Sequence, residues 1–217
     1  LESGRVECWI ENAQRAASWL RESGEVDRVT GIGFRAGALF ALAAAARQPA
    51  DGVVLWAPPA KGNHFVREFR AVSMTAAATA NLERREGEPL ETSGFRLSHE
   101  TCVDIGKLNA TDFVPRVRRA LIVSRDESPT NSRLCDHLRA AQIEATEVGG
   151  PGFADIITLP HETRVPDTTL AAIVDWLNEP INSSATEEAL TNAVSSSARP
   201  STRSEEHTSE LQSHSFI

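Results

Sequence analysis

The sequence predicts an α/β fold in which helices flank a parallel β-sheet. A strand, a helix and a second strand follow one another over residues 28–57, and the same order returns over residues 119–148. Such repeats are typical of right-handed βαβ units, whose strands lie parallel in one sheet. A third observation is the glycine-rich turn within residues 29–37, where the first strand passes directly into its helix.

The first unit begins with an amphipathic helix. Residues 6–23 place apolar side chains at helical spacing with charged residues between them, so this helix should pack on the sheet. Residues 28–34 form the first predicted strand, and the alanine- and leucine-rich residues 36–47 form the helix after it. A second buried strand, over residues 52–57, ends at Pro58-Pro59. These elements make up the first βαβ unit.

The alternation stops over residues 60–118. We expect a helix around residues 65–76, a short extended segment over residues 90–97, and a helix from Ser98, its N-cap, to about Gly106. An insertion at this place lies above the carboxyl ends of the strands, where ligands bind in open α/β sheets. We therefore expect it to cap a pocket.

The second unit resumes the alternation. The pattern predicts a strand over residues 119–124, a helix over 129–142 and a short strand over 144–148. A loop over residues 149–166 precedes a last helix over residues 167–177. The apolar stripe of that helix consists of Leu170, Ile173, Val174 and Leu177.

The C-terminal part differs in kind from the rest, so we expect the folded domain to occupy residues 1–180. Residues 181–202 are rich in Ser, Ala, Thr and Asn, which indicates a disordered tail or linker. Residues 203–217 resemble the translation of a sequencing-adapter oligonucleotide, so we expect them not to be native and exclude them from the fold. The histidines in that segment are therefore no metal candidates.

Composition excludes several classes of partner. The chain has 217 residues and a formal net charge of −8, which argues against nucleic acids and anionic membranes. Its longest apolar run falls far short of the roughly 20 residues that span a bilayer. Three widely spaced cysteines form no C-x-x-C pair, which favours reduced thiols and a cytoplasmic location. Without a metal-binding motif, a Walker loop or a full dinucleotide pattern, we expect no metal and no cofactor, and the oligomeric state stays open.

The turn Gly33-Phe-Arg-Ala-Gly37 is shaped like a nucleophile elbow, whose pattern is G-x-S-x-G. Small residues at Gly33, Ala36 and Gly37 allow the tight backbone that such an elbow needs. Arg35 stands where the serine belongs, and a guanidinium is always protonated and has no lone pair for attack. Arg35 could form a structural ion pair at the carboxyl edge of the sheet. It could instead hold a carboxylate or phosphate at the helix N-terminus, with Gly33 and Gly37 beside it.

Other segments carry a family resemblance together with this elbow: Val54-Leu-Trp-Ala-Pro58, Arg67-Glu-Phe-Arg-Ala71, Ser93-Gly-Phe-Arg-Leu-Ser98 and Pro151-Gly-Phe153. With them, residues 5–178 resemble the C-terminal portion of an α/β-hydrolase fold. More narrowly they resemble serine-aminopeptidase-like hydrolases of the exosortase-A-associated type. The resemblance implies hydrolysis of an ester, thioester or amide in a small-molecule or acyl substrate, connected with exopolysaccharide assembly or protein sorting.

The same resemblance implies that the chain is an N-terminally truncated fragment. The first strands of the fold and the loop that completes the oxyanion hole would precede residue 1, which leaves the strand over residues 28–34 with one open edge. A buried hydrophobic strand with an open edge invites aggregation. We therefore expect residues 1–180 alone to be insoluble or molten.

The order nucleophile, acid, histidine in α/β-hydrolases suggests further site residues. Asp126 occupies the place of the acid, with Glu127 in reserve, and His161 occupies the place of the histidine. Asp126 could instead be a helix cap or an ion-pair partner, and His161 a solvated loop residue. A cation at Arg35 would pair with the acid and discourage imidazolium formation, which opposes general-base chemistry. The alternative function is a non-catalytic pseudo-hydrolase that binds an anionic ligand or partner.

Further polar residues are weaker candidates. Ser124 ends a different strand without an elbow, so we do not expect it to replace the missing nucleophile. His64 and His99 fall in the predicted cap, where we expect surface or capping roles. His137 falls in an amphipathic helix among charged residues and should face solvent.

Overall fold

A four-stranded parallel sheet with the order β1-β2-β5-β6 lies at the centre of the fold in a computed structural model. Its strands are β1 (Thr30–Phe34), β2 (Gly52–Trp56), β5 (Arg119–Val123) and β6 (Glu144–Val148). Helix α2 (Ala36–Arg47) connects the first pair of strands, and helix α5 (Ser132–Ala140) connects β5 to β6. The predicted α/β class and both βαβ units are confirmed.

The structure describes residues 4–24, 26–79, 88–92, 95–125, 131–158 and 161–181. The predicted tail over residues 181–202, except for residue 181, and the adapter-like segment over residues 203–217 lie outside this range.

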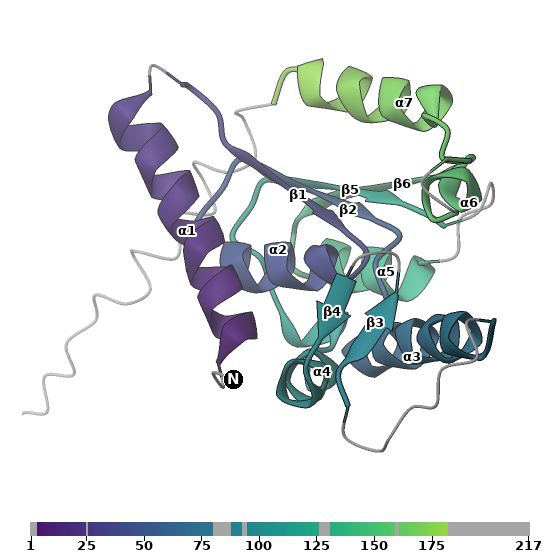
Figure 1. The fold of residues 1–217 in the computed structure, drawn as a ribbon. Coiled ribbons are helices and arrows are strands. Elements are labelled where there is room, and N and C mark those ends of the chain that lie inside the picture. Colours follow the sequence, from purple (N-terminus) through teal and green to yellow (C-terminus); the bar gives the residue numbers. More distant parts are fainter. Residues whose placement is uncertain are drawn as a thin grey trace, which may run out of the picture. The chain divides into compact units, whose positions relative to one another are not determined.

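Helices cover the two faces of the sheet in separate layers (Figure 1). Helices α2 and α5 lie on one face, where α1 (Arg5–Ser23) packs against α2, and α7 (Asp167–Asn178) lies on the other. All side chains of β2 are buried, and they alternate between the two layers. Val53 and Leu55 join the core under α2 and α5, whereas Val54 and Trp56 join the core under α7. A strand buried on both faces explains the continuous apolar run in the sequence.

The insertion after β2 consists of α3 (Gly62–Thr79), the antiparallel pair β3 (Leu90–Thr92) and β4 (Phe95–Leu97), α4 (His99–Gly106) and a 3-10 turn (Ala110–Asp112). The expected extended segment over residues 90–97 is therefore a pair of strands. Ser98 caps α4 as predicted, because its Oγ accepts a hydrogen bond from the Thr101 backbone N–H at 3.2 Å.

The insertion packs beside the sheet helices. Val66 and Ile105 of the insertion share a core with Ile10 of α1 and Ala43 of α2. Within the described residues of the insertion, those that line the pocket at the carboxyl edge come from the start of α3.

The C-terminal elements differ from the prediction in two places. A short helix, α6 (Phe153–Ile156), lies within the predicted loop. The predicted stripe of α7 is partly wrong, because Ile173 is buried but Leu170 and Val174 are exposed, and Trp176 takes a buried position instead. The core on this face of the sheet takes Ile173 and Trp176 from α7 as its buried residues, and Leu177 is partly buried against it, so a narrow stripe suffices.

Strand β1 lies at an edge of the described sheet, with β2 as its neighbour there. Its side chains Ile32 and Phe34 are exposed, unlike those of the inner strands. Among the residues that the structure describes, no helix has the length and apolar character needed to cross a membrane.

Candidate active-site pocket

Arg35 forms the turn between β1 and α2 in a strained conformation. Its φ of 51° and ψ of −119° lie outside the regions that side-chain-bearing residues prefer, and such a residue costs about 1–3 kcal/mol. Hydrogen bonds hold the turn: the Arg35 N–H donates to the Trp56 carbonyl at 2.8 Å, and the Ala38 N–H donates to the Arg35 carbonyl at 3.0 Å. The backbone is thus the sharp strand-to-helix turn that the motif predicts.

Gly33 makes this turn possible for a steric reason. A Cβ at Gly33 would lie 2.4 Å from the Gly37 carbonyl oxygen and 2.5 Å from the Ala38 Cα. A Cβ at Gly37 would meet nothing within 4 Å. The two glycines that were predicted to bind a ligand therefore have different roles, because only Gly33 is needed for the close approach of β1 to α2. Neither glycine lines the pocket that contains Arg35.

A pocket of about 160 Å³ lies beside Arg35, at the carboxyl ends of the strands. Arg35 follows β1, Ala57 follows β2, and Arg125 comes two residues after the end of β5. The pocket is lined by Arg35, Ala57, Pro58, Pro59, His64, Phe65, Glu68, Arg125 and Asn131. It lies where open parallel sheets bind their ligands.

One carboxylate bridges two arginines in this pocket. Arg35 Nη2 donates to Glu68 Oε2 at 2.7 Å, and Arg125 Nη1 donates to Glu68 Oε1 at 2.8 Å. The Arg35 side chain is 22% exposed, whereas Glu68 and Arg125 are 43% and 45% exposed. The guanidinium of Arg35 also lies 5.1 Å from the centre of the Phe65 ring, and that of Arg125 4.9 Å from the Phe153 ring. Both distances fall within the range of cation–π attraction.

Burial lowers the pKa of Arg35, and the positive charge of Arg125 lowers it further, while Glu68 acts in the opposite direction. Arginine nevertheless stays protonated in proteins. Arg35 is therefore a partly desolvated cation whose charge only Glu68 offsets among the described pocket residues.

The predicted histidine is exposed and does not line the pocket that holds this cluster. The His161 side chain is 76% exposed, and its Nε2 lies 3.9 Å from Glu162 Oε1. It is not among the residues that line the pocket. Asp126 and Glu127, the predicted acid and its substitute, lie outside the described residues.

Ser124 is engaged in the structure of the second βαβ unit. It is fully buried, and its hydroxyl donates to Glu147 Oε1 at 2.7 Å. Asn131 Nδ2 donates to Ser124 Oγ at 3.1 Å. These contacts agree with the expectation that Ser124 does not replace the missing nucleophile.

Among the described residues, sequence reasoning missed four polar contributors to the pocket: His64, Glu68, Arg125 and Asn131. His64 was expected at the surface and is exposed, yet it lines the pocket together with Glu68, one helical turn further along α3. This i, i+4 pair, which begins five residues after Pro59, was the available signal. Arg125 could have been noticed because it follows a strand that ends at the same edge.

His137, expected to face solvent, is half-buried and bonds the Phe113 carbonyl oxygen through Nε2 at 2.9 Å.

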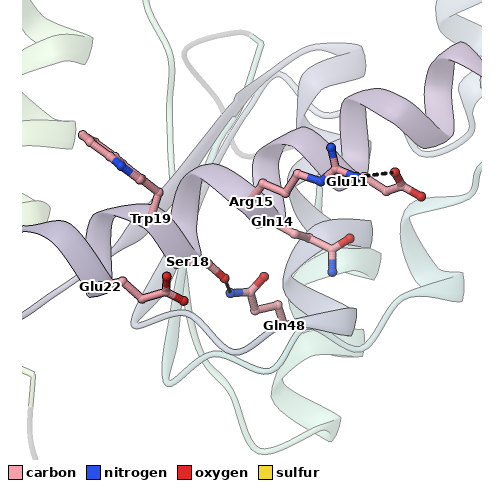
Figure 2. A pocket seen from close by; sticks show the side chains of 7 residues that line it. All are labelled: Glu11, Gln14, Arg15, Ser18, Trp19, Glu22 and Gln48. Atoms are coloured by element: carbon pink, nitrogen blue, oxygen red, sulfur yellow. Dashed lines mark hydrogen bonds and ion pairs between the residues drawn. The ribbon is translucent and has the colours of Figure 1, made fainter.

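A larger hollow of about 380 Å³ is lined by residues of α1 and by Gln48, the residue that follows α2 (Figure 2). Four of its polar side chains pair with one another: Gln48 Nε2 donates to Ser18 Oγ at 2.7 Å, and Arg15 forms an ion pair with Glu11 at 3.7 Å. Trp19 lies apart from these pairs. None of the described residues that line this hollow follows the carboxyl end of a strand, where open parallel sheets bind their ligands, so we take the smaller pocket at that edge as the candidate site.

An apolar groove of about 320 Å³ runs between α1, α2 and the edge strand β1. Its lining includes Trp9, Phe40 and Val53, together with Gly37. Few polar side chains line it, and it is therefore no active-site candidate.

Within the described ranges, no three His, Cys, Asp or Glu side chains are grouped so that they could hold a metal ion.

These observations define an α/β protein with a strained strand-to-helix turn and a pair of arginines at the carboxyl edge of its parallel sheet. Compared with models of known protein families and with curated proteins, the chain matches none.

Proposed function

We propose that this chain binds a small anionic ligand in the pocket at the carboxyl edge of its sheet and does not perform serine-type hydrolysis there. The observation that carries the proposal is the position of Arg35. Its backbone adopts the strained turn in which a nucleophile is presented, but its side chain is a cation.

The charges of the pocket support an anionic ligand. Arg35 and Arg125 contribute two positive charges and Glu68 one negative charge, which leaves an excess of +1 among the described residues that line it. Arg35 is partly desolvated, so its attraction for an anion is screened less than that of a surface arginine. Planar guanidinium groups suit carboxylate and phosphate oxygens, since each offers several N–H donors in a fixed plane.

The remaining geometry argues against general-base catalysis at this site. A serine hydrolase needs its histidine within hydrogen-bond reach of the nucleophile. His161 is largely exposed and outside the pocket lining, and Ser124 donates to a carboxylate instead. No proton transfer route to a nucleophile is present among these described groups.

The second candidate is hydrolysis of an ester, thioester or amide, of the exosortase-associated type that the sequence resembles. The strained backbone at Arg35 favours it, because strain of this kind persists at sites where function requires it. In this case Asp126 and His161 would serve as acid and histidine, and another chain or segment would supply the nucleophile.

Ligand-dependent stability of the full chain tests the proposal. The melting temperature should rise with sodium propionate or sodium phosphate, relative to sodium chloride at equal ionic strength, since a ligand that binds only the folded state stabilises it. Arg35→Met should abolish the rise. Arg15→Met, which removes an exposed arginine on α1, should leave it unchanged.

Two activity measurements separate the candidates. The anion-binding proposal expects no turnover of short p-nitrophenyl esters and no labelling by a fluorophosphonate probe. Labelling of a serine that disappears in His161→Ala would establish the hydrolase instead. An anion-induced rise in melting temperature that survives in Arg35→Met would place the ligand elsewhere and refute the proposal.

A further inference from the structure

We infer that the anion is a carboxylate, and that it binds by taking the place of Glu68 between Arg35 and Arg125. The inference rests on the proposed function and specifies both its ligand class and its regulation. Glu68 is then an internal competitor for the ligand, held on α3 at the mouth of the site.

The arrangement of Glu68 shows what the two arginines recognise. Each carboxylate oxygen accepts from a different guanidinium, at 2.7 Å from Arg35 and 2.8 Å from Arg125. These arginines follow β1 and β5, which lie on either side of β2 in the sheet. A single planar carboxylate therefore spans the end of β2, and a ligand carboxylate in the same plane would make the same pair of charge-assisted bonds.

Glu68 is placed so that it can leave. Its described contacts are the two arginines, and its side chain is 43% exposed. Ion pairs with this exposure contribute little to stability, because water solvates the separated charges well. Arg35, by contrast, stays in position, since its backbone is hydrogen-bonded to β2 and α2 and its guanidinium rests on Phe65.

The desolvation of Arg35 favours a carboxylate over a phosphate. A phosphate group carries more charge than a carboxylate and presents three oxygens that need hydrogen-bond donors. Two arginines in a partly desolvated pocket satisfy these three oxygens less completely than the two oxygens of a carboxylate. A carboxylate restores the charge balance that Glu68 now provides. The apolar lining from Pro58, Pro59 and Phe65 leaves room for a short hydrocarbon or aromatic group attached to it, within about 160 Å³.

Calorimetric titration of the 217-residue chain with phenylacetate tests this inference, with phenylacetamide and phenyl phosphate as matched probes. Phenylacetate should bind, and phenylacetamide should not. Glu68→Gln, which keeps the size of the side chain and removes its charge, should tighten phenylacetate binding about fivefold, as expected for release of a weak competing ion pair. Glu11→Gln removes an exposed carboxylate on α1 and should leave the affinity unchanged.

Glu68→Asp provides a second variant in case Glu68→Gln does not fold. Its shorter side chain keeps the charge but reaches the two arginines less well, so it too should tighten binding. Unchanged or weaker binding in the Glu68 variants, while Arg35→Met still abolishes it, overturns the displacement and leaves the proposed function intact. Tighter binding of phenyl phosphate than of phenylacetate overturns the carboxylate class. Phenylacetate binding that survives in Arg35→Met defeats the proposed function itself.

Discussion

The two ends of the sheet each place an arginine against an aromatic ring, but with different results. At the amino end of β5, Arg119 is 5% exposed and its guanidinium lies 4.1 Å from the centre of the Trp176 ring. Its Nη2 donates to the Leu177 carbonyl oxygen at 3.3 Å, and its Nη1 lies 4.0 Å from Glu179 Oε2. Arg119 thus joins β5 to the end of α7.

At the carboxyl end, Arg35 has a strained backbone and a solvent-accessible partner. Its ring contact with Phe65 resembles that of Arg119, but its carboxylate partner, Glu68, is shared with Arg125 and faces a pocket. An aromatic ring and a lowered exposure therefore do not separate Arg35, which we propose binds the ligand, from the structural Arg119. The separating features are backbone strain, a shared partner that can leave, and an adjacent cavity.

The largest loss of stability should come from adding a side chain at Gly33, where the elbow at the carboxyl end of the sheet needs free space. Gly33→Ala should destabilise the fold by about 3 kcal/mol, because its Cβ would overlap backbone atoms that cannot move independently. Urea unfolding followed by circular dichroism measures the loss. Gly37→Ala is the matched control: its Cβ meets nothing nearby, so stability should be equal or higher. Equal losses in the two variants would contradict the steric account of the elbow.

Removing the arginine at the amino end should have the next largest effect. Arg119→Met keeps the hydrocarbon stem but loses the contact over Trp176 and the hydrogen bond to Leu177, so about 2 kcal/mol should be lost. Arg35→Met should change the unfolding free energy much less, because its partner is half-exposed. The same urea series compares them. If Arg35→Met proves the more damaging of the two, Arg35 is the structural arginine.

Relieving the strain at the elbow should stabilise the protein and, if the proposed function holds, also remove anion binding. Arg35→Gly should raise the unfolding free energy by about 1 kcal/mol, because glycine adopts a φ of 51° without strain. The gain is smaller than the full strain, because glycine loses more backbone entropy on folding than other residues. Arg35→Ala keeps a Cβ and therefore the strain, so it should not show this gain. Thermal unfolding of both variants measures the difference. Equal stabilities would mean that the turn is not strained.

A third arginine, Arg47, forms an exposed ion pair whose contribution to stability can be compared with those of Arg35 and Arg119. Arg47, at the end of α2, donates two hydrogen bonds to Glu7, and these bonds hold the pKa of Glu7 below its usual range. Both side chains are about half exposed. Since the folded-state pKa is lowered, the stabilisation is present above the unfolded pKa of about 4.3 and is lost as the pH falls through the folded value.

Glu7→Gln should therefore cost less than about 1 kcal/mol at pH 7, and the difference from the unsubstituted chain should vanish in acid. Unfolding free energies between pH 7 and pH 3 measure this. A difference that persists at the acid end would show that packing, not charge, is lost at Glu7.

Sequence reasoning predicted the elements well and the site only in part. The strand over residues 144–148 and the helix over residues 36–47 match their predicted bounds, because local periodicity and propensity dominate there. The elbow at Arg35 was predictable because its glycine spacing is local. The buried face of α7 was partly missed, since Leu170 and Val174 are apolar in sequence but are exposed among the residues that the structure describes.

The amino-acid sequence by itself determined the α/β class, the two βαβ units and the cation at the elbow. These depend on residues close together in the chain, where spacing and side-chain chemistry act directly. Only the tertiary structure decided which carboxylate meets that cation. Arg35, Glu68 and Arg125 come from the end of β1, from α3 and from the segment after β5. The two arginines meet because parallel strands end at one edge of the sheet, and Glu68 joins them because α3 begins soon after β2 ends at that same edge. Local patterns mark the separate residues but do not encode this convergence.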